Sequence, residues 1–334
     1  MSPHHVSQAD ERRVATGRAH GKIILLGEHA VVYGAPALAL PVPALSCQAT
    51  AGRLNGHGPG PLRLRRVVSP PGTPAETTEE SASEELRLLV DAFARRAGLA
   101  GPPGLEVLLE SGVPPARGLG SSAATARALV HALDRLFGTG LSDRDVFELV
   151  QVSEQSAHGR ASGIDALATG GTGPVLLADG RGSTPPVGAA CHVVVVDTGS
   201  GSGTGKAVAM LRDLFTRAPG RRTEFLDRST ELTRAALGDL ANGRLPALGR
   251  RLTVCHTMLA GLGLTTERTD ATVRAALDAG ALGAKMTGGG LGGCVIALAA
   301  TRREAAAVAA LLTREQGVRT WHVPVAKGAG HDGF

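Results

Sequence analysis

A glycine-rich segment ahead of a predicted helix has the residue types of an anion-binding loop. It reads Gly-Leu-Gly-Ser-Ser from Gly118 to Ser122, and helical periodicity follows as far as Phe137. Glycines let several backbone N–H groups point at one spot, and the helix adds the positive end of its dipole. The serine hydroxyls could bond phosphate oxygens or bind Mg²⁺. An ordinary helix start with serine caps is the alternative, but the density of the pattern favours an anion site.

Three charged residues could supply the chemistry of a phosphate transfer at such a loop. Glu154 lies near the end of a predicted helix, and Asp165 follows eleven residues later in a short-sided segment expected to be a loop, residues 158–165. Glu154 with a serine hydroxyl would suit the preference of Mg²⁺ for oxygen ligands. Asp165 could accept a proton from an attacking hydroxyl, and Lys22 could stabilise the developing alkoxide. Taken singly, each acid is more simply explained as solvated surface.

Lysine is rare in this chain, which carries 31 arginines and only four lysines. A retained lysine therefore marks a place that needs a compact ammonium group and not a planar guanidinium. Three of the four lie in or beside glycine-rich segments. The four are Lys22, Lys206, Lys285 and Lys327.

Two further glycine-rich segments call for explanation. Five glycines occupy six positions between Gly288 and Gly293, a costly composition for a plain hairpin, so we expect a backbone that passes close to a ligand or another loop. The segment from Gly199 to Lys206 resembles a flexible linker, and it fails as a P-loop because Ser200 and Ala207 stand where glycine and a hydroxyl are needed. A dinucleotide site at Gly118 is disfavoured, since the next element is a helix and not the required strand.

The elements that must position these residues mix strands and helices without regular alternation, which favours the α+β class. Residues 52–81 are expected to form a loop or mobile insertion, and Ser81 with Glu84 reads as the capping box of the helix that follows. A second capping box is expected at Ser142 and Asp145. Pro185-Pro186 marks a boundary between residues 14–187 and 188–327. Strands are expected on both sides of residues 27–34 and at 105–110, 173–178, 192–196, 284–287, 294–299 and 318–325, and helices at 122–137, 142–157, 205–217, 223–241, 246–262, 267–279 and 302–315.

Composition narrows the function classes. The chain has 334 residues, a formal charge of +5 and 43% hydrophobic residues, which excludes global disorder. One Trp, one Tyr and six Phe leave too few rings for a single-stranded nucleic-acid binder, and the basic residues are scattered, so no nucleic-acid partner is expected. Four distant cysteines and no apolar run of about 18 residues indicate a cytoplasmic protein without a membrane partner.

Three segments, in this order, resemble the conserved motifs of the GHMP kinase superfamily and, within it, of the mevalonate kinase family. The first runs from Gly21 to Gly34 as GKIILLGEHAVVYG, the second from Pro114 to Ala124 as PPARGLGSSAA, and the third from Lys285 to Cys294 as KMTGGGLGGC. The resemblance covers about residues 14–326. One departure is His20, which stands where the family usually has proline before the first motif. The resemblance implies an N-terminal domain like domain 2 of ribosomal protein S5 and a C-terminal ferredoxin-like α/β plait.

The resemblance also implies roles for individual residues. The loop would cradle the phosphates of ATP, Ser122 and Glu154 would hold Mg²⁺, and the third motif would brace the loop. Asp165 would take the proton of the substrate hydroxyl, with Lys22 beside it. Glu28, His29 and Thr204 would contact the substrate together with Lys22 and Asp165. The implied nucleotide contacts are Pro114, Gly118, Leu119, Gly120, Ser121, Ser122 and Ala123.

The activity implied by the resemblance is ATP-dependent phosphorylation of the 5-hydroxyl of (R)-mevalonate to 5-phosphomevalonate, in isoprenoid biosynthesis. Two alternatives stay open: another GHMP small-molecule kinase, such as one that acts on phosphomevalonate, and a nucleotide-binding regulator without catalysis. A homodimer is compatible with the family. Intact Lys22, Glu154 and Asp165 argue against the regulator, because a non-catalytic homologue has no need of all three.

Overall fold

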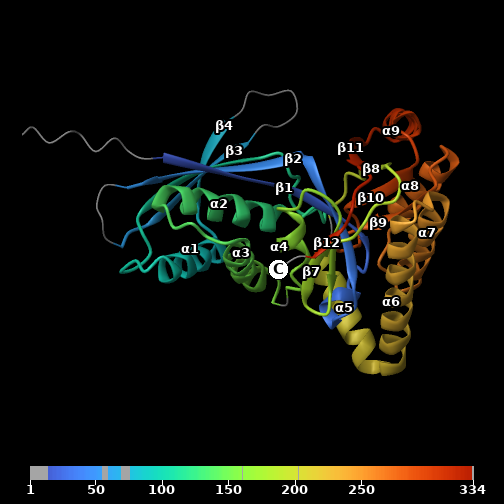
Figure 1. Ribbon diagram of the computed structural model, residues 1–334, viewed down its shortest axis with the longest axis horizontal. Coiled ribbons are helices and arrows are strands. Elements are labelled where there is room, and N and C mark those ends of the chain that lie inside the picture. The colour runs from blue at the N-terminus through green and yellow to red at the C-terminus, as the bar shows by residue number, and fades with distance from the viewer. Residues whose placement is uncertain (1–13, 55–58, 69–75, 160, 202, 333–334) are drawn as a thin grey trace, which may run out of the picture.

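The computed structural model describes residues 14–54, 59–68, 76–159, 161–201 and 203–332. Its first sheet runs in the order β12-β7-β6-β2-β5-β3-β4, with β1 paired to β2. Helices α1, α2 and α3 lie along one side of this sheet (Figure 1). The strands are β1 (Val14–Leu26), β2 (Ala37–Arg53), β3 (Leu62–Val68), β4 (Glu76–Ser81), β5 (Leu105–Ser111), β6 (Val175–Ala178), β7 (Arg181–Thr184) and β12 (His331–Asp332); the helices are α1 (Glu84–Arg96), α2 (Ser121–Phe137), α3 (Asp143–His158), α4 (Ile164–Ala168) and the 3₁₀ turn η1 (Ala30–Tyr33).

The second sheet has the order β11-β8-β10-β9, with every neighbouring pair antiparallel. Helices α8 and α9 bury an apolar cluster with Val194, Val196 and Val295 of this sheet. The long helices α6 and α7 lie side by side at the same end of the molecule (Figure 1). The strands are β8 (Cys191–Asp197), β9 (Gly283–Thr287), β10 (Cys294–Ala299) and β11 (Arg319–Val325); the helices are α5 (Thr204–Arg217), α6 (Pro219–Ala241), α7 (Leu245–Gly261), α8 (Glu267–Asp278) and α9 (Arg302–Gln316).

A long antiparallel hairpin, β1 with β2, forms the spine of the molecule. Its register pairs Val14 with Gly52 and Lys22 with Pro41. Helix α2 lies so close on β1 that a Cβ at Gly17 would overlap the carbonyl of Ala128. This close approach brings the start of α2 beside Lys22, where the backbone N–H of Lys22 donates to the Leu119 carbonyl at 2.9 Å.

One apolar core runs through both sheets. Leu25 and Leu40 of the hairpin belong to the same buried cluster as Val193 and Leu298 of the second sheet. Burial of apolar surface contributes roughly 25 cal/mol per Å², so the two sheets stabilise each other and hold the residues between them in place.

The α+β class is confirmed, and the capping box of Ser142 and Asp145 is present at the start of α3. Three expectations were wrong. Residues 62–68 and 76–81 of the expected loop form β3 and β4, because β3 pairs in parallel with β5 through Leu64 and its neighbours; residues 55–58 and 69–75 lie outside the described residues. The N-cap position of helix α1 is Ser83, which makes no side-chain cap hydrogen bond, and not Ser81, which ends β4. Asp165 lies in helix α4 and not in a loop.

The predicted boundary at residues 187–188 falls between β7 of the first sheet and β8 of the second. Val187 forms a bridge with Gly328, and β12 pairs with β7. The last described residues thus return to the first sheet after the second sheet is complete. The described part of the chain contains no helix long and apolar enough to cross a membrane.

Candidate active site

A cavity of about 1730 Å³ is lined by both halves of the molecule. Strand β1, the turn before η1, the loop ahead of α2, and helices α3 and α4 contribute to it from the first half. Helix α5 and the loop after β9 contribute from the second. Of the residues predicted for the site, the ones that line the cavity are Lys22, Glu28, His29, Pro114, Gly118, Leu119, Gly120, Ser121, Ser122, Glu154, Asp165 and Thr204. Ala123 is fully buried in α2 and does not line it.

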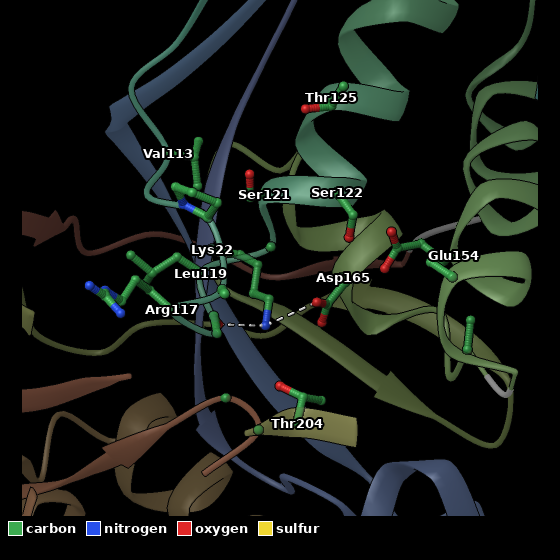
Figure 2. Close-up of a pocket in the computed structure, with 18 of the residues that line it drawn as sticks. Lys22, Val113, Arg117, Leu119, Ser121, Ser122, Thr125, Glu154, Asp165 and Thr204 are labelled. Carbon is green, nitrogen blue, oxygen red and sulfur yellow. Dashed lines mark hydrogen bonds and ion pairs between the residues drawn. The ribbon is translucent and has the colours of Figure 1, made fainter. Parts of the chain in front are cut away.

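Lys22 and Asp165 form an ion pair on the wall of this cavity. The Nζ atom of Lys22 lies 3.0 Å from Oδ2 of Asp165 and donates to the Gly118 carbonyl at 3.1 Å (Figure 2). The Lys22 side chain is only 4% exposed, whereas that of Asp165 is 31% exposed. A buried ammonium therefore holds a carboxylate that remains open to the cavity.

The loop ahead of α2 has the backbone geometry of an anion site. Gly118 and Gly120 have φ values of 75° and 73°, which glycine adopts without strain. Gly120 is the N-cap of α2 and has no side chain to bond the free N–H groups of the first turn. Ser121 and Ser122, the first two residues of α2, line the cavity, so an anionic group bound there would satisfy the free N–H groups at this end of the helix.

The third glycine-rich segment packs directly on this loop. A Cβ at Gly288 would lie 2.7 Å from the Cα of Gly118, and a Cβ at Gly118 would lie 3.1 Å from the Cα of Gly288. The Thr287 hydroxyl, one residue earlier, bonds both the N–H and the carbonyl of Ile24 at 2.8 and 3.0 Å. The close backbone approach expected from the sequence is thus a contact between the second and third motifs.

Ser122 and Glu154 provide oxygen atoms on the opposite side of the cavity from Arg117 (Figure 2). Ser122 is exposed to the cavity, and Glu154 is a buried carboxylate at 3% exposure. Among the described residues, no group of three or more His, Cys, Asp or Glu side chains is arranged to hold a metal ion. The donor set fits Mg²⁺, because this ion takes one or two protein oxygens and fills its remaining positions with water and phosphate oxygens.

Glu28 and His29 stand in the turn that joins β1 to η1. The Glu28 carboxylate forms an ion pair with Lys285 in β9, and both side chains are almost fully buried. Burial raises the pKa of Glu28, and the charge of Lys285 opposes that shift. Burial, with a smaller contribution from Lys285, lowers the pKa of His29 to about 4. His29 therefore faces the cavity as a neutral imidazole at neutral pH.

Thr204 is the first residue of α5 and lines the cavity from the second half of the molecule. A Cβ at Gly289 would overlap the Thr204 side chain. Gly289 thus lets the start of α5 pack against the third motif, and Thr204 lines the same cavity as Lys22 and Asp165.

Sequence reasoning missed Lys285 and Arg117 as site residues. The scarcity of lysine was the available signal for Lys285. Arg117 lies inside the second motif, and its Nε atom is 3.0 Å from the buried carboxylate of Asp197 at the end of β8. It also donates to the Gly199 carbonyl at 3.1 Å. Arg117 thereby ties the loop to the second sheet, a contact between distant segments that no local pattern predicts.

Comparison with protein families agrees with this geometry. Residues 86–172 match the model of the GHMP kinases N terminal domain, and residues 236–318 match the model of the GHMP kinases C terminal domain. The class that the fold and the site define is thus that of the GHMP kinases.

Several curated proteins are similar to this chain over most of its length. A mevalonate kinase of Thermococcus onnurineus is 33% identical, with 87% of this chain and 91% of that protein covered. A mevalonate kinase of Aeropyrum pernix is 32% identical, with 86% and 89% covered. The crystal structure of a mevalonate kinase of L. major in complex with R-mevalonate superposes with a TM-score of 0.76 at 25% identity, covering 97% of this chain and 99% of that one. The chain belongs to the mevalonate kinase family of the GHMP kinases.

Proposed function

We propose that this protein transfers the γ-phosphoryl group of ATP to the 5-hydroxyl of (R)-mevalonate and releases 5-phosphomevalonate, a step of isoprenoid biosynthesis. The observation that carries the proposal is the ion pair of Lys22 and Asp165, which lies beside the start of α2 in the shared cavity. The curated relatives, which are mevalonate kinases, support the choice of substrate.

The loop from Pro114 to Ala123 binds the nucleotide in this proposal. The N–H groups at the start of α2 stabilise the phosphate oxygens, with Gly118, Leu119 and Gly120 approaching them through backbone alone. Ser121 and Ser122 add hydroxyl groups. Ala123 supports the helix from within the core, since it does not reach the cavity.

Asp165 acts as the base and Lys22 as the electrostatic partner of the reacting hydroxyl. Asp165 accepts the proton as the hydroxyl oxygen bonds to the γ-phosphorus, and the bond from that phosphorus to the bridging oxygen breaks so that ADP leaves. The Lys22 ammonium, 3.0 Å from that carboxylate, stabilises negative charge on the attacking oxygen. Phosphoryl transfer depends mostly on positioning and charge neutralisation, and both side chains are supplied by regular secondary structure, β1 and α4.

Ser122 and Glu154 hold Mg²⁺ in this proposal. The ion supplies charge neutralisation for the phosphate oxygens when it is bound. Glu28, His29 and Thr204 contact mevalonate in this proposal. The neutral imidazole of His29 is suited to a hydrogen bond with a hydroxyl group. Glu28 contacts the substrate while its carboxylate stays paired with Lys285.

The cellular setting also belongs to the proposal. The four cysteines are free and buried, which suits a reducing compartment such as the cytoplasm. A homodimer stays a prediction, which sedimentation of the purified protein tests directly.

An ADP-release assay against mevalonate, phosphomevalonate, homoserine and galactose tests the activity. We expect turnover with mevalonate and little with the others. Preference for phosphomevalonate would identify a different GHMP kinase, and tight ATP binding without turnover would identify a regulator.

Asp165→Asn tests the base. A general base contributes about 10²- to 10⁴-fold, so we expect kcat to fall within that range while ATP binding by calorimetry stays within about threefold of wild type. A variant with full activity would refute the assignment of Asp165.

A further inference from the structure

Arg127 is a buried arginine for which the proposed mechanism has no use. It lies in the second turn of α2 and is 7% exposed. In the described part of the chain it has no ion pair with a carboxylate. Burial lowers its pKa to about 10, and the more distant Asp143 opposes that shift, so the guanidinium stays charged at neutral pH. An unpaired buried charge is expensive, which calls for a reason specific to this position.

The guanidinium is bonded to the helix that carries Asp165. Its Nη2 atom donates to the carbonyl of Ala166 at 2.7 Å. That carbonyl lies in the five-residue helix α4, whose last carbonyls have no partner within the helix. Thr169 reaches it only at 3.5 Å and bonds the Asp165 carbonyl at 2.9 Å instead. Arg127 is thus the principal hydrogen-bond donor to the carbonyl of Ala166, the residue directly after Asp165.

The chain leaves room for this contact at Gly170. A Cβ at Gly170 would overlap the Nη1 and Cζ atoms of Arg127, and the Arg127 atoms are the nearest ones to that position. Gly170 does not have a positive φ, so its backbone would accept alanine. The glycine is therefore explained by the space that the guanidinium occupies.

The contact joins α2, whose start is proposed to bind the phosphates, to α4, which carries Asp165. Helix α2 begins at Ser121, where the phosphate groups are proposed to bind, and Arg127 follows within two turns. Helix α4 is short and presents Asp165 in its first turn. A hydrogen bond from a charged donor is stronger than one from a neutral donor, and it here spans α2 and α4 directly.

We propose that Arg127 is a positioning residue that fixes α4, and with it the Asp165 carboxylate, relative to the start of α2. The inference rests on the proposed function, in which Asp165 is the base. Arg127 does not line the cavity and acts only through Ala166. Gly170 is the second part of the device, because it admits the guanidinium.

The test compares Arg127→Ala, Gly170→Ala and the double variant by mevalonate-dependent ADP release. A misplacement near 1 Å can cost about 10²-fold in rate, so we expect kcat to fall about 10- to 100-fold in each single variant, with both KM values within about threefold. The double variant should match Arg127→Ala, because the added Cβ then meets no guanidinium. The proposal would be overturned by a wild-type kcat in Arg127→Ala. It would also be overturned if the fold-loss of kcat in the double variant equalled the product of the fold-losses in the two single variants.

Arg135→Ala is the matched control. Arg135 lies in the same helix and also donates to a backbone carbonyl, that of Thr16, away from the cavity. Its removal should leave kcat within about twofold. Guanidinium ion at a non-denaturing concentration should restore part of the kcat of Arg127→Ala and none of the kcat of Gly170→Ala. If the lower kcat of Arg127→Ala came only from a smaller amount of folded protein, guanidinium ion would not restore it.

Amide hydrogen exchange separates failure of the inference from failure of the proposed function. Residues 164–168 should exchange at least tenfold faster in Arg127→Ala than in wild type or Arg135→Ala, whatever the substrate proves to be. If exchange is faster in Arg127→Ala but the wild-type protein does not turn over mevalonate, the proposed function is refuted and the role of Arg127 stands. Unchanged exchange in a wild-type-like active variant would refute the role of Arg127 alone.

Discussion

At the scale of single residues, the site depends on side chains that cannot be exchanged for others of the same charge. Lys22 is packed so tightly that a Cβ at Gly120 would lie 2.9 Å from its Cγ atom. Lys285 is fully buried against Glu28. Both are among the four lysines of an arginine-rich chain, although only Lys22 was predicted as a site residue. The family resemblance implied that Lys22 lies beside Asp165, as the structure has it, but the pairing of Glu28 with Lys285 could not be predicted.

Lys22→Arg should lower kcat by about 10²-fold or more, because the planar guanidinium is too large for the space beside Gly120 and cannot keep both contacts. ATP binding should change little. Steady-state kinetics and calorimetry measure the two quantities. Lys206→Arg is the control, since Lys206 is exposed in the first turn of α5; equal losses in the two variants would contradict the prediction.

His29 should make the protein less stable in acid. Its pKa falls from 6.5 to about 4 on folding, so between these values the unfolded chain binds a proton that the folded chain rejects. Stability is therefore lost as the pH falls through this window, by about 2 kcal/mol between pH 7 and pH 5. His29→Gln should reduce the acid-dependent loss of unfolding free energy by that amount in urea titrations. An unchanged pH dependence would show that folding does not lower the pKa of His29.

At the scale of elements, the helices were largely predictable and the sheet edge was not. Helices were predicted at the positions of α1, α2, α3 and α5 to α9, since the sequence signals of a helix lie within the element or beside its ends. Strands β3 and β4 were missed. Strand β4 has the fully exposed sequence ETTEES, without an apolar alternation, and it is a strand because it pairs with β3. Helix α4 was missed because five residues are too few for a periodic pattern.

Gly288→Ala tests the packing of one loop on another. The new Cβ would lie 2.7 Å from Gly118 at a φ of +82°, so the phosphate loop must shift. We expect KM for ATP to rise about tenfold or more, in a protein that still folds.

Gly280→Ala is the matched control for this change. Gly280 also has a positive φ, +92°, but has no atom within 4 Å of an added Cβ. Backbone strain is common to both variants, so only Gly288→Ala should weaken ATP binding. Equal KM values would contradict the bracing role of the third motif.

At the scale of the whole molecule, long-range contacts join the two sheets around the cavity. Glu28 meets Lys285 and Arg117 meets Asp197, in each case across the two halves. The motifs and their order allowed the family fold and most cavity residues to be predicted. Contacts between residues 80 to 257 positions apart could not be, because they depend on how the sheets pack.

Lys285→Met should destabilise the protein by about 3–5 kcal/mol, because it leaves the Glu28 carboxylate buried without its cation. Adding Glu28→Gln should recover much of that loss. Chemical denaturation of the single and double variants measures the coupling, with the exposed Lys327→Met as control. Additive losses in the double variant would show that the two groups do not stabilise each other.

The return of β12 to β7 has a consequence for the order in which the protein can fold during synthesis. Strand β7 is made early, but its partner at residues 331–332 leaves the ribosome only after all four strands of the second sheet. Chains grow from the N-terminus, so this edge of β7 stays open until residues 331–332 have been made. The growing chain therefore exposes an unpaired strand edge until then.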